Sequence, residues 1–180
     1  MIIIIMGPQG SGKSTQAALL AKKLKLPHLQ VGEVLRELAQ QGTRLGLRAK
    51  SFWGRGRLVT EKLFRQILQE EIKKDRYRSG LVGDGVPRTL IQAKNLPFKV
   101  DKVIYLRVRD EENVKRLRLR KREDDTVGSI TERLKLYHRE TEPVLDFYRG
   151  QGILLEVDGE RSIEAIYRDI CSRFKINDSD

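Results

Sequence analysis

Short apolar runs alternate along the chain with longer segments in which apolar residues recur at helical spacing. The runs occupy residues 2–6, 81–83, 103–106 and 153–157. Behind the first run, Ala17, Leu20, Ala21 and Leu24 follow the i, i+3, i+4, i+7 spacing of one helix face. Continuous apolar strands that are separated by helices are typical of a parallel sheet covered on both faces. The pattern therefore predicts a single α/β domain over residues 1–180, an ordinary size for one domain.

The segment from residue 29 to residue 59 has no clear strand pattern. Its apolar spacing predicts two short helices, at residues 33–40 and 45–52. An excursion of this length from a compact sheet usually forms a lid or a binding lobe. Farther along, the helical pattern of residues 126–148 contains Pro143, which predicts a kink or a break at that point.

The first apolar run ends in a glycine-rich motif, Gly7-x-x-x-x-Gly12-Lys13-Ser14. Between a buried strand and a helix, such a loop points backbone N–H groups at one concavity, where the helix dipole also favours an anion. Lys13 would bridge the β- and γ-phosphates of a nucleotide, and the Ser14 hydroxyl can help to hold Mg²⁺. The motif therefore predicts a nucleoside triphosphate site.

The net charge of +11 is the unusual feature of the composition. Much of it lies in residues 115–122, where six of the eight positions are Lys or Arg. A basic surface can bind nucleic acid, an acidic membrane or a small polyanion such as a nucleotide. The same run also fits a solvated helix face with no ligand at all.

Cysteine content and hydropathy narrow the class of protein. The single cysteine, Cys171, excludes a disulfide framework within the chain and a multi-cysteine zinc site, and it favours a reducing compartment. The apolar run at the N-terminus is too short for a signal peptide or a membrane span, and no later segment is long enough. We therefore expect a cytoplasmic protein with no zinc and no membrane partner.

Further segments stand out beyond the phosphate-binding loop. They are Gly32-Glu33-Val34-Leu35-Arg36, Gly56-Arg57-Leu58-Val59, Asp84-Gly85-Val86-Pro87-Arg88-Thr89 with Gln92, Arg122-Glu123-Asp124-Asp125, Arg133-Leu134, Tyr137-His138 and Thr141-Glu142-Pro143. Together with the loop, in this order and spacing, they resemble the adenylate kinases within the nucleoside monophosphate kinases. The resemblance implies a P-loop NTPase-type fold with a five-stranded parallel sheet, helices on both faces, a helical monophosphate-binding lobe at residues 30–59 and a lid. It also implies the reversible reaction of Mg·ATP with AMP to give two ADP, with Mg²⁺ as cofactor.

Arginine residues dominate the reaction centre that the resemblance implies. Phosphoryl transfer is chiefly positioning and charge neutralisation, so its site needs cations more than a base. Arg36, Arg88 and Arg133 would clamp the AMP phosphate and the γ-phosphate, because the arginine fork contacts two phosphate oxygens and stays charged. Asp84, at the end of a buried strand, would hold Mg²⁺ with Ser14, partly through water. The residues implied in catalysis are Lys13, Asp84, Arg88, Arg122 and Arg133.

The resemblance also implies a set of binding residues for each nucleotide. For ATP, the set is Gly10, Ser11, Gly12, Lys13, Ser14, Thr15, Arg116, Arg120 and Arg161. For AMP, it is Val31, Arg36, Arg57, Leu58, Val59, Gly85, Val86, Pro87, Arg88, Gln92, Arg122 and Arg133. Arg116 and Arg120 are one helical turn apart and can face the same ligand. The basic run is then better explained as a wall of the ATP site than as a nucleic-acid patch.

Two positions give opposite indications about the acceptor base. By the resemblance, Gln92 would pair with the Watson–Crick edge of adenine, and its spacing from Thr89 favours AMP over the uridylate/cytidylate pattern. Val31, however, takes the place of a threonine that usually hydrogen-bonds AMP, and valine offers no such bond. Ser14 in place of the usual glycine is a milder departure. A kinase for UMP, CMP or several monophosphates therefore stays open beside an AMP kinase.

The lid that the resemblance implies is nearly missing. In most of the family a longer segment separates the equivalents of Arg120 and Arg122, whereas here only Lys121 intervenes. Residues 120–125 are therefore predicted to be a vestigial lid, too short for an independent hairpin. Because a neighbouring copy of the chain could cover the site instead, an oligomer also stays open.

A nucleotide-gated RNA- or ribosome-binding factor is the alternative from another class, and the charge of +11 motivates it. It predicts salt-dependent binding of polynucleotides and poor turnover of monophosphates. A nucleotide-gated factor that transfers no phosphoryl group does not need the AMP-binding residues Arg36, Arg88 and Gln92. We therefore favour the kinase, with ATP, AMP and ADP as its ligands and with nucleic acid not expected as a partner.

Overall fold

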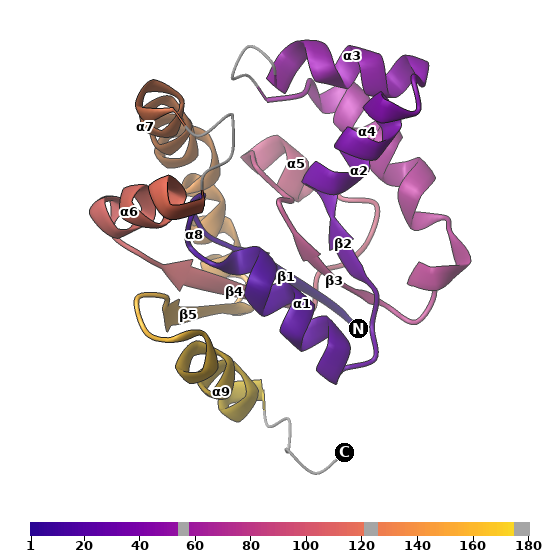
Figure 1. The fold of residues 1–180 in the computed structure, drawn as a ribbon. Helices are drawn as coiled ribbons and strands as arrows, with labels where there is room; N and C mark the ends of the chain where they lie inside the picture. Colours follow the sequence, from indigo (N-terminus) through magenta and orange to yellow (C-terminus); the bar gives the residue numbers. More distant parts are fainter. Residues whose placement is uncertain (54–57, 121–125, 175–180) are drawn as a thin grey trace.

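A computed structural model describes residues 1–53, 58–120 and 126–174 (Figure 1). Within these residues, five parallel strands form one sheet in the order β2-β3-β1-β4-β5. The strands are β1 (Ile2–Met6), β2 (His28–Gln30), β3 (Leu81–Asp84), β4 (Lys102–Arg107) and β5 (Leu154–Asp158). The predicted α/β fold with a parallel sheet is confirmed.

Helices connect the strands and cover the sheet. They are α1 (Lys13–Lys23), α2 (Val31–Gln40), α3 (Arg44–Trp53), α4 (Glu61–Ile72), the 3₁₀ turn η1 (Asp75–Tyr77), α5 (Leu90–Lys94), α6 (Asp110–Arg120), α7 (Val127–Leu136), the π-helical turn η2 (Tyr137–Thr141), α8 (Pro143–Gly150) and α9 (Ile163–Phe174). The two short helices expected between residues 29 and 59 are confirmed as α2 and α3, which pack against each other.

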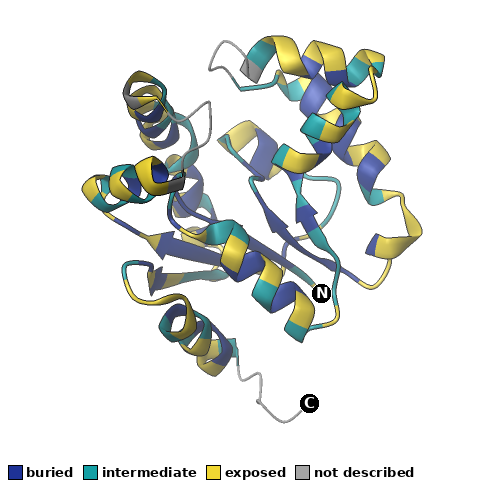
Figure 2. Cartoon of the chain, viewed as in Figure 1, coloured by how far each residue is buried: buried dark blue, intermediate teal, exposed yellow. Residues whose placement is uncertain are grey.

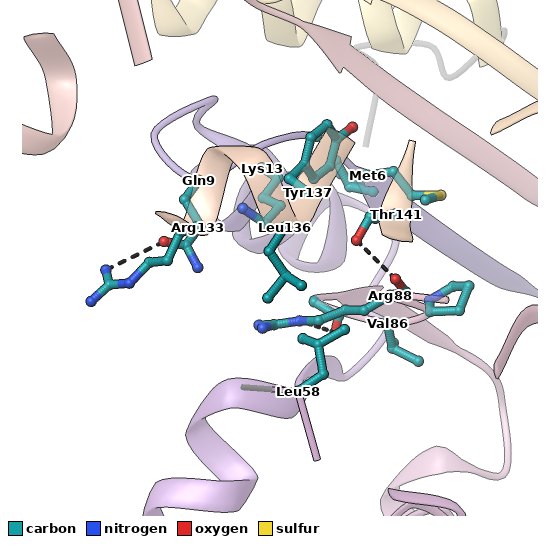
Figure 3. A pocket seen from close by; sticks show the side chains of 14 residues that line it. Met6, Gln9, Lys13, Leu58, Val86, Arg88, Arg133, Leu136, Tyr137 and Thr141 are labelled. Atoms are coloured by element: carbon teal, nitrogen blue, oxygen red, sulfur yellow. Dashed lines mark hydrogen bonds between the residues drawn. The ribbon is translucent and has the colours of Figure 1, made fainter. Parts of the chain in front are cut away.

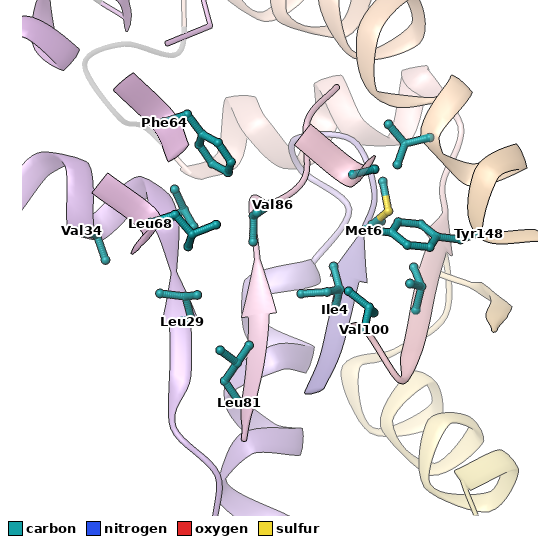
Figure 4. Close-up of a cluster of buried hydrophobic side chains, with 14 of the residues drawn as sticks. Ile4, Met6, Leu29, Val34, Phe64, Leu68, Leu81, Val86, Val100 and Tyr148 are labelled. Carbon is teal, nitrogen blue, oxygen red and sulfur yellow. The ribbon is translucent and has the colours of Figure 1, made fainter. Parts of the chain in front are cut away.

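The two faces of the sheet belong to different buried clusters, and the central strands β1, β3 and β4 are buried along most of their length (Figure 2). On one face, Ile3 and Ile5 of β1 pack with apolar residues of α1 and α9. On the opposite face, Ile4 shares a cluster with Phe64 of α4 and Tyr148 of α8 (Figure 4). The alternation of β1 side chains between the two layers follows from the period of two in a strand.

Strand β2 is the element that the hydrophobic pattern missed. The pattern predicts no strand after residue 29, yet His28–Gln30 pairs in parallel with the end of β3. Three residues are too few to display an alternation, and Leu29 is the one apolar position among them. Leu29 is nevertheless fully buried, so β2 is anchored in the core at the edge of the sheet.

The helical segment after residue 126 is interrupted where the sequence predicts. Pro143 is the first residue of α8, a position at which its missing N–H leaves no helical hydrogen bond unmade. The preceding π-helical turn η2 has no signal in the apolar spacing, because it is a single turn of altered hydrogen bonding. It bears on function because Tyr137 and Thr141, at its two ends, both line the pocket described below.

Residues 54–57, 121–125 and 175–180 lie outside the described part of the chain. The predicted vestigial lid at residues 120–125 falls almost wholly outside it, as do the predicted ligand residues Arg57 and Arg122. Among the helices in the described ranges, none is long and apolar enough to cross a membrane.

Candidate active site

Two of the glycines in the loop between β1 and α1 lie well inside the left-handed region of backbone conformation. Gly10 and Gly12 have φ angles of 91° and 86°, in the left-handed region that other residues rarely adopt. A Cβ at Gly10 would also lie 2.8 Å from the carbonyl oxygen of Asn113 in α6. Gly12 is the N-cap of α1, and Lys13 is the first residue of that helix. This is the strand–loop–helix context that the phosphate-binding motif requires.

Polar groups suited to an anion gather at this loop. Ser11 is fully buried, and its Oγ has no hydrogen-bond partner among the described residues. Lys13 Nζ donates to the carbonyl oxygen of Pro8 at 3.0 Å, so the ammonium group lies back along the loop. The N–H groups in the first turn of α1 add positive partial charge. A phosphate group at this place would meet hydroxyl, ammonium and backbone donors together.

A pocket opens beside the loop, at the carboxyl ends of β1 and β3 (Figure 3). Its lining is Ile5, Met6, Gly7, Gln9, Lys13, Leu58, Gly85, Val86, Pro87, Arg88, Arg133, Leu136, Tyr137 and Thr141. Half of these were predicted as ligand or catalytic residues, namely Lys13, Leu58, Gly85, Val86, Pro87, Arg88 and Arg133. The carboxyl edge of a parallel sheet is where ligands bind in open α/β folds. In Figure 3 the Arg88 side chain extends across the pocket between Leu58 and Leu136.

Arg88 is the centre of positive charge in this pocket. Burial of its guanidinium lowers the pKa of Arg88, the Asp84 carboxylate opposes that shift, and the charges of Arg36 and Arg133 add to the lowering. Because an arginine stays protonated in spite of such a shift, the direction shows that the surroundings disfavour the positive charge of Arg88. A bound anion would remove this penalty, so the cluster is electrostatically prepared for a phosphate group.

Hydrogen bonds hold Arg88 in place from three sides. Its Nε donates to the carbonyl oxygen of Gly85 at 3.1 Å, and its backbone N–H donates to Gln92 Oε1 at 2.8 Å. Its carbonyl oxygen accepts a hydrogen bond from Thr141 Oγ1 at 2.8 Å, across from η2. None of these three bonds uses the terminal guanidinium nitrogens. The backbone of Arg88 is therefore held at its N–H and at its carbonyl oxygen. These three bonds leave the two terminal guanidinium nitrogens available to contact a phosphate group.

The other two arginines near Arg88 come from separate helices and have partners of their own. Arg133 of α7 donates to Gln9 Oε1 of the phosphate loop at 3.3 Å. Arg36 of α2 forms an ion pair with Glu33, one turn earlier in the same helix. Both side chains influence the charge of Arg88, so three elements distant in sequence contribute to one electrostatic cluster.

Asp84 lies at the level of the phosphate loop, as its position at the end of β3 predicts. It pairs in register with Ile5 of β1, and its side chain is only 4% exposed. Its Oδ2 is 3.1 Å from His28 Nε2, a contact with β2 that no motif indicated. From the same strand, Gln30 Nε2 donates to Ser14 Oγ at 3.2 Å.

Several predicted ligand residues lie apart from the pocket lining. Arg161 pairs with Asp169 of α9 at 2.5 Å, and Arg116 of α6 pairs with Glu112 at 2.8 Å and donates to the Gly159 carbonyl at 2.8 Å. These cations would have to exchange partners to contact ATP, and their roles stay predictions. Four described residues of the acceptor set are also outside the lining, namely Val31, Arg36, Val59 and Gln92. So are Gly10, Ser11, Gly12, Ser14, Thr15 and Asp84. The structure does not describe the side chain of Arg120.

Comparison with known proteins decides the family. The sequence model of the adenylate kinases matches residues 5–153. The chain belongs to the adenylate kinase family. Three adenylate kinases show how far the similarity extends. That of Prochlorococcus marinus is 38% identical over 92% of this chain and 93% of its own length. The adenylate kinase of Mycolicibacterium paratuberculosis is 37% identical over 96% of this chain and 98% of its own length. The adenylate kinase of Archaeoglobus fulgidus is 34% identical over 94% of this chain and 96% of its own length.

Membership in the adenylate kinase family makes the chain a nucleotide-binding transferase of the nucleoside monophosphate kinase type. The resemblance that the motifs indicated is thereby confirmed, and so is the fold class that it implied. The individual site residues stay predictions, now with a defined geometry around the pocket.

Some residues that the structure brings to the site had no role in the sequence-based interpretation. Gln9 and Leu136 line the pocket, and Thr141 holds the Arg88 carbonyl oxygen. Thr141 was part of a segment that resembles other adenylate kinases, but its spacing from Arg88 gives no sign of contact. The contacts of His28 and Gln30 depend on β2, which the sequence pattern did not predict.

Proposed function

We propose that the chain catalyses the reversible transfer of the γ-phosphoryl group from Mg·ATP to AMP, which gives two ADP. The observation that carries this proposal is the meeting of Lys13 with Arg88 and Arg133 around one pocket. A phosphoryl group that passes between two nucleotides carries charge on its peripheral oxygens, and cations placed around it stabilise the transition state. The phosphate loop would hold the donor, and the Arg88 side of the pocket would hold the acceptor.

Preorganisation is what the surrounding hydrogen bonds add to this chemistry. Gln92 and Thr141 fix the backbone of Arg88 before any ligand arrives. A cation that is already oriented needs little reorganisation during the reaction. More of its attraction for the transferred phosphoryl group is then available to lower the activation barrier. No side chain in the pocket is required as a strong base, since alignment and charge supply most of the rate.

The residues at the loop fit a hard divalent cation. Ser14 offers a hydroxyl oxygen and Asp84 a buried carboxylate, and oxygen donors of this kind suit Mg²⁺. When bound with ATP, Mg²⁺ would neutralise phosphate charge and orient the phosphate oxygens. Within the described ranges, no group of three or more His, Cys, Asp or Glu side chains is arranged to hold a metal ion. Phosphate oxygens and water would therefore complete the coordination.

Gln92 is the residue on which we base the preference for adenine. Its side-chain oxygen accepts from the Arg88 N–H, and its amide NH₂ can donate to N1 on the Watson–Crick edge of the base. Val31, buried at the start of α2, has no hydrogen-bonding group in its side chain. We propose that residues 30–59 form the acceptor lobe and residues 120–125 the vestigial lid of one domain, in a cytoplasmic enzyme.

A panel of nucleoside monophosphates tests the proposed acceptor. With Mg·ATP as donor, we expect kcat/KM for AMP to exceed that for UMP, CMP and GMP by at least about tenfold, the worth of one good hydrogen bond to the base. The measurement is the initial rate of ADP formation with each acceptor and with none. Equal rates for AMP and for a pyrimidine monophosphate would overturn the assignment and favour the broad-specificity kinase.

The Gln92→Glu variant, assayed with the same panel, tests whether the Gln92 amide recognises adenine. Glutamate keeps an oxygen that can accept the Arg88 N–H, but it loses the amide donor. The preference for AMP over the other monophosphates should therefore shrink, while kcat with saturating AMP stays within about threefold of the parent protein. An unchanged preference would show that the adenine is recognised elsewhere.

A further inference from the structure

Strand β2 carries two polar side chains on the face of the sheet that bears the phosphate loop. Leu29 belongs to the buried cluster on the opposite face, and successive strand residues alternate between faces. His28 and Gln30 therefore point toward α1. In the parallel pairing with β3, His28 is the partner of Val82 and Gln30 is the partner of Asp84. The end of this three-residue strand thus lies beside the proposed magnesium-binding groups.

Each of the two side chains contacts one of those groups. Gln30 Nε2 donates to Ser14 Oγ at 3.2 Å, and His28 Nε2 lies 3.1 Å from Asp84 Oδ2. A serine hydroxyl that accepts this bond is restrained in its rotation and keeps a second lone pair for another partner. Asp84 likewise keeps its other oxygen, Oδ1, outside the bond to His28. Both contacts restrain a potential ligand without occupying all of its oxygen lone pairs.

The Gln30–Ser14 contact depends on the hydroxyl group of Ser14. A residue without a side-chain hydroxyl at this position would offer no acceptor to the Gln30 amide. The serine therefore adds an oxygen donor at the loop, and Gln30 supplies the neighbour that orients it. Groups that hydrogen-bond to metal ligands typically change metal affinity by 10- to 100-fold when they are removed.

We propose that β2 is a positioning element for the divalent cation, with Gln30 orienting the Ser14 hydroxyl and His28 orienting the Asp84 carboxylate. This inference rests on the proposed function, because it takes Ser14 and Asp84 as the groups that face Mg²⁺. Gln30 and His28 are positioning residues, since they act on the cation only through the side chains that they hold. The Ser14 hydroxyl then contributes directly to the affinity for the cation.

The test is the affinity of Mn²⁺, measured by electron paramagnetic resonance, for the protein saturated with a non-hydrolysable ATP analogue. We expect Gln30→Met, which keeps the side-chain length but loses the amide, to raise the Kd for Mn²⁺ by about tenfold. Ser14→Ala should raise it by at least as much. The Kd for Mn²⁺ of the double variant should be no higher than that of Ser14→Ala alone, because Gln30 acts through the Ser14 hydroxyl. Binding of the analogue in excess EDTA should stay within about twofold in all three variants.

Two further variants separate positioning from a general loss of stability. Gln16→Met makes the same change at a buried amide of α1, whose Nε2 donates to the Ile163 carbonyl at 2.9 Å, and it should leave the Kd for Mn²⁺ unchanged. His28→Ala should weaken Mn²⁺ binding, and His28→Gln should restore most of it by supplying a donor of similar reach. Far-UV circular dichroism and thermal unfolding identify any variant that fails to fold.

An unchanged Kd for Mn²⁺ in Gln30→Met, or additive losses in the double variant, would overturn the inference. If the parent protein still transfers phosphoryl groups to AMP in that case, the positioning role fails and the proposed function stands. If the parent protein forms no ADP from ATP and AMP, the proposed function itself fails.

Discussion

Arg88→Ala is expected to lower kcat for phosphoryl transfer by about 1,000-fold, the effect of removing an arginine that stabilises the transferred group. Arg88 lies across the pocket, its backbone is fixed by Gln92 and Thr141, and its charge is disfavoured until an anion binds. The variant loses both the charge and the preorganised fork. The measurement is steady-state ADP formation at saturating ATP and AMP. Because removal of the side chain relieves repulsion from Arg36 and Arg133, thermal stability should not fall.

Two further variants give this experiment its controls. Arg88→Lys keeps a positive charge but loses the planar fork, so it should recover only part of the lost rate. Arg78→Ala removes an exposed arginine that pairs with Asp75 in η1, and it should leave kcat unchanged. A kcat within tenfold of the parent protein in Arg88→Ala would contradict the role assigned to Arg88.

Lys13→Met is expected to lower kcat by about 100- to 1,000-fold, as the loss of a preorganised donor to developing charge does in other enzymes. Lys13 is the first residue of α1 and lines the same pocket as Arg88, from the side of the phosphate loop. Methionine preserves the length of the side chain, so the loop should keep its conformation. Rates at saturating nucleotides, together with calorimetric binding of ATP, separate lost turnover from lost affinity.

Lys22→Met provides the matched comparison, because Lys22 is an exposed lysine in the last turn of the same helix. It should bind ATP and turn over like the parent protein. Full turnover in Lys13→Met would show that the loop is not the donor-phosphate site. A loss of kcat in Lys22→Met as large as that in Lys13→Met would show the same.

The sequence was sufficient to predict those parts of the fold and site that are encoded locally. The strands β1, β3, β4 and β5 appear as apolar runs, and Gly10 and Gly12 lie in a motif whose spacing reflects one backbone conformation. The break before α8 follows from the fixed geometry of Pro143. Each of these depends on neighbouring residues alone, which is why a single sequence reveals it.

The parts that could not be predicted depend on contacts between distant segments. β2 is too short for its pattern to show, and its edge position is stabilised by pairing with β3. The bond from Thr141 to the Arg88 carbonyl joins residues 53 positions apart, and the π-helical turn η2 that carries Thr141 has no sequence signature. Spacing also cannot show that Arg161 is already paired with Asp169.

Transfer of a phosphoryl group from ATP to AMP can be followed by ³¹P nuclear magnetic resonance in a single reaction mixture. With ATP, AMP and Mg²⁺ present, the AMP resonance should decline and two molecules of ADP should appear for each AMP consumed. Addition of EDTA should stop the exchange. An AMP resonance that stays constant while the protein is folded and binds ATP would contradict the account.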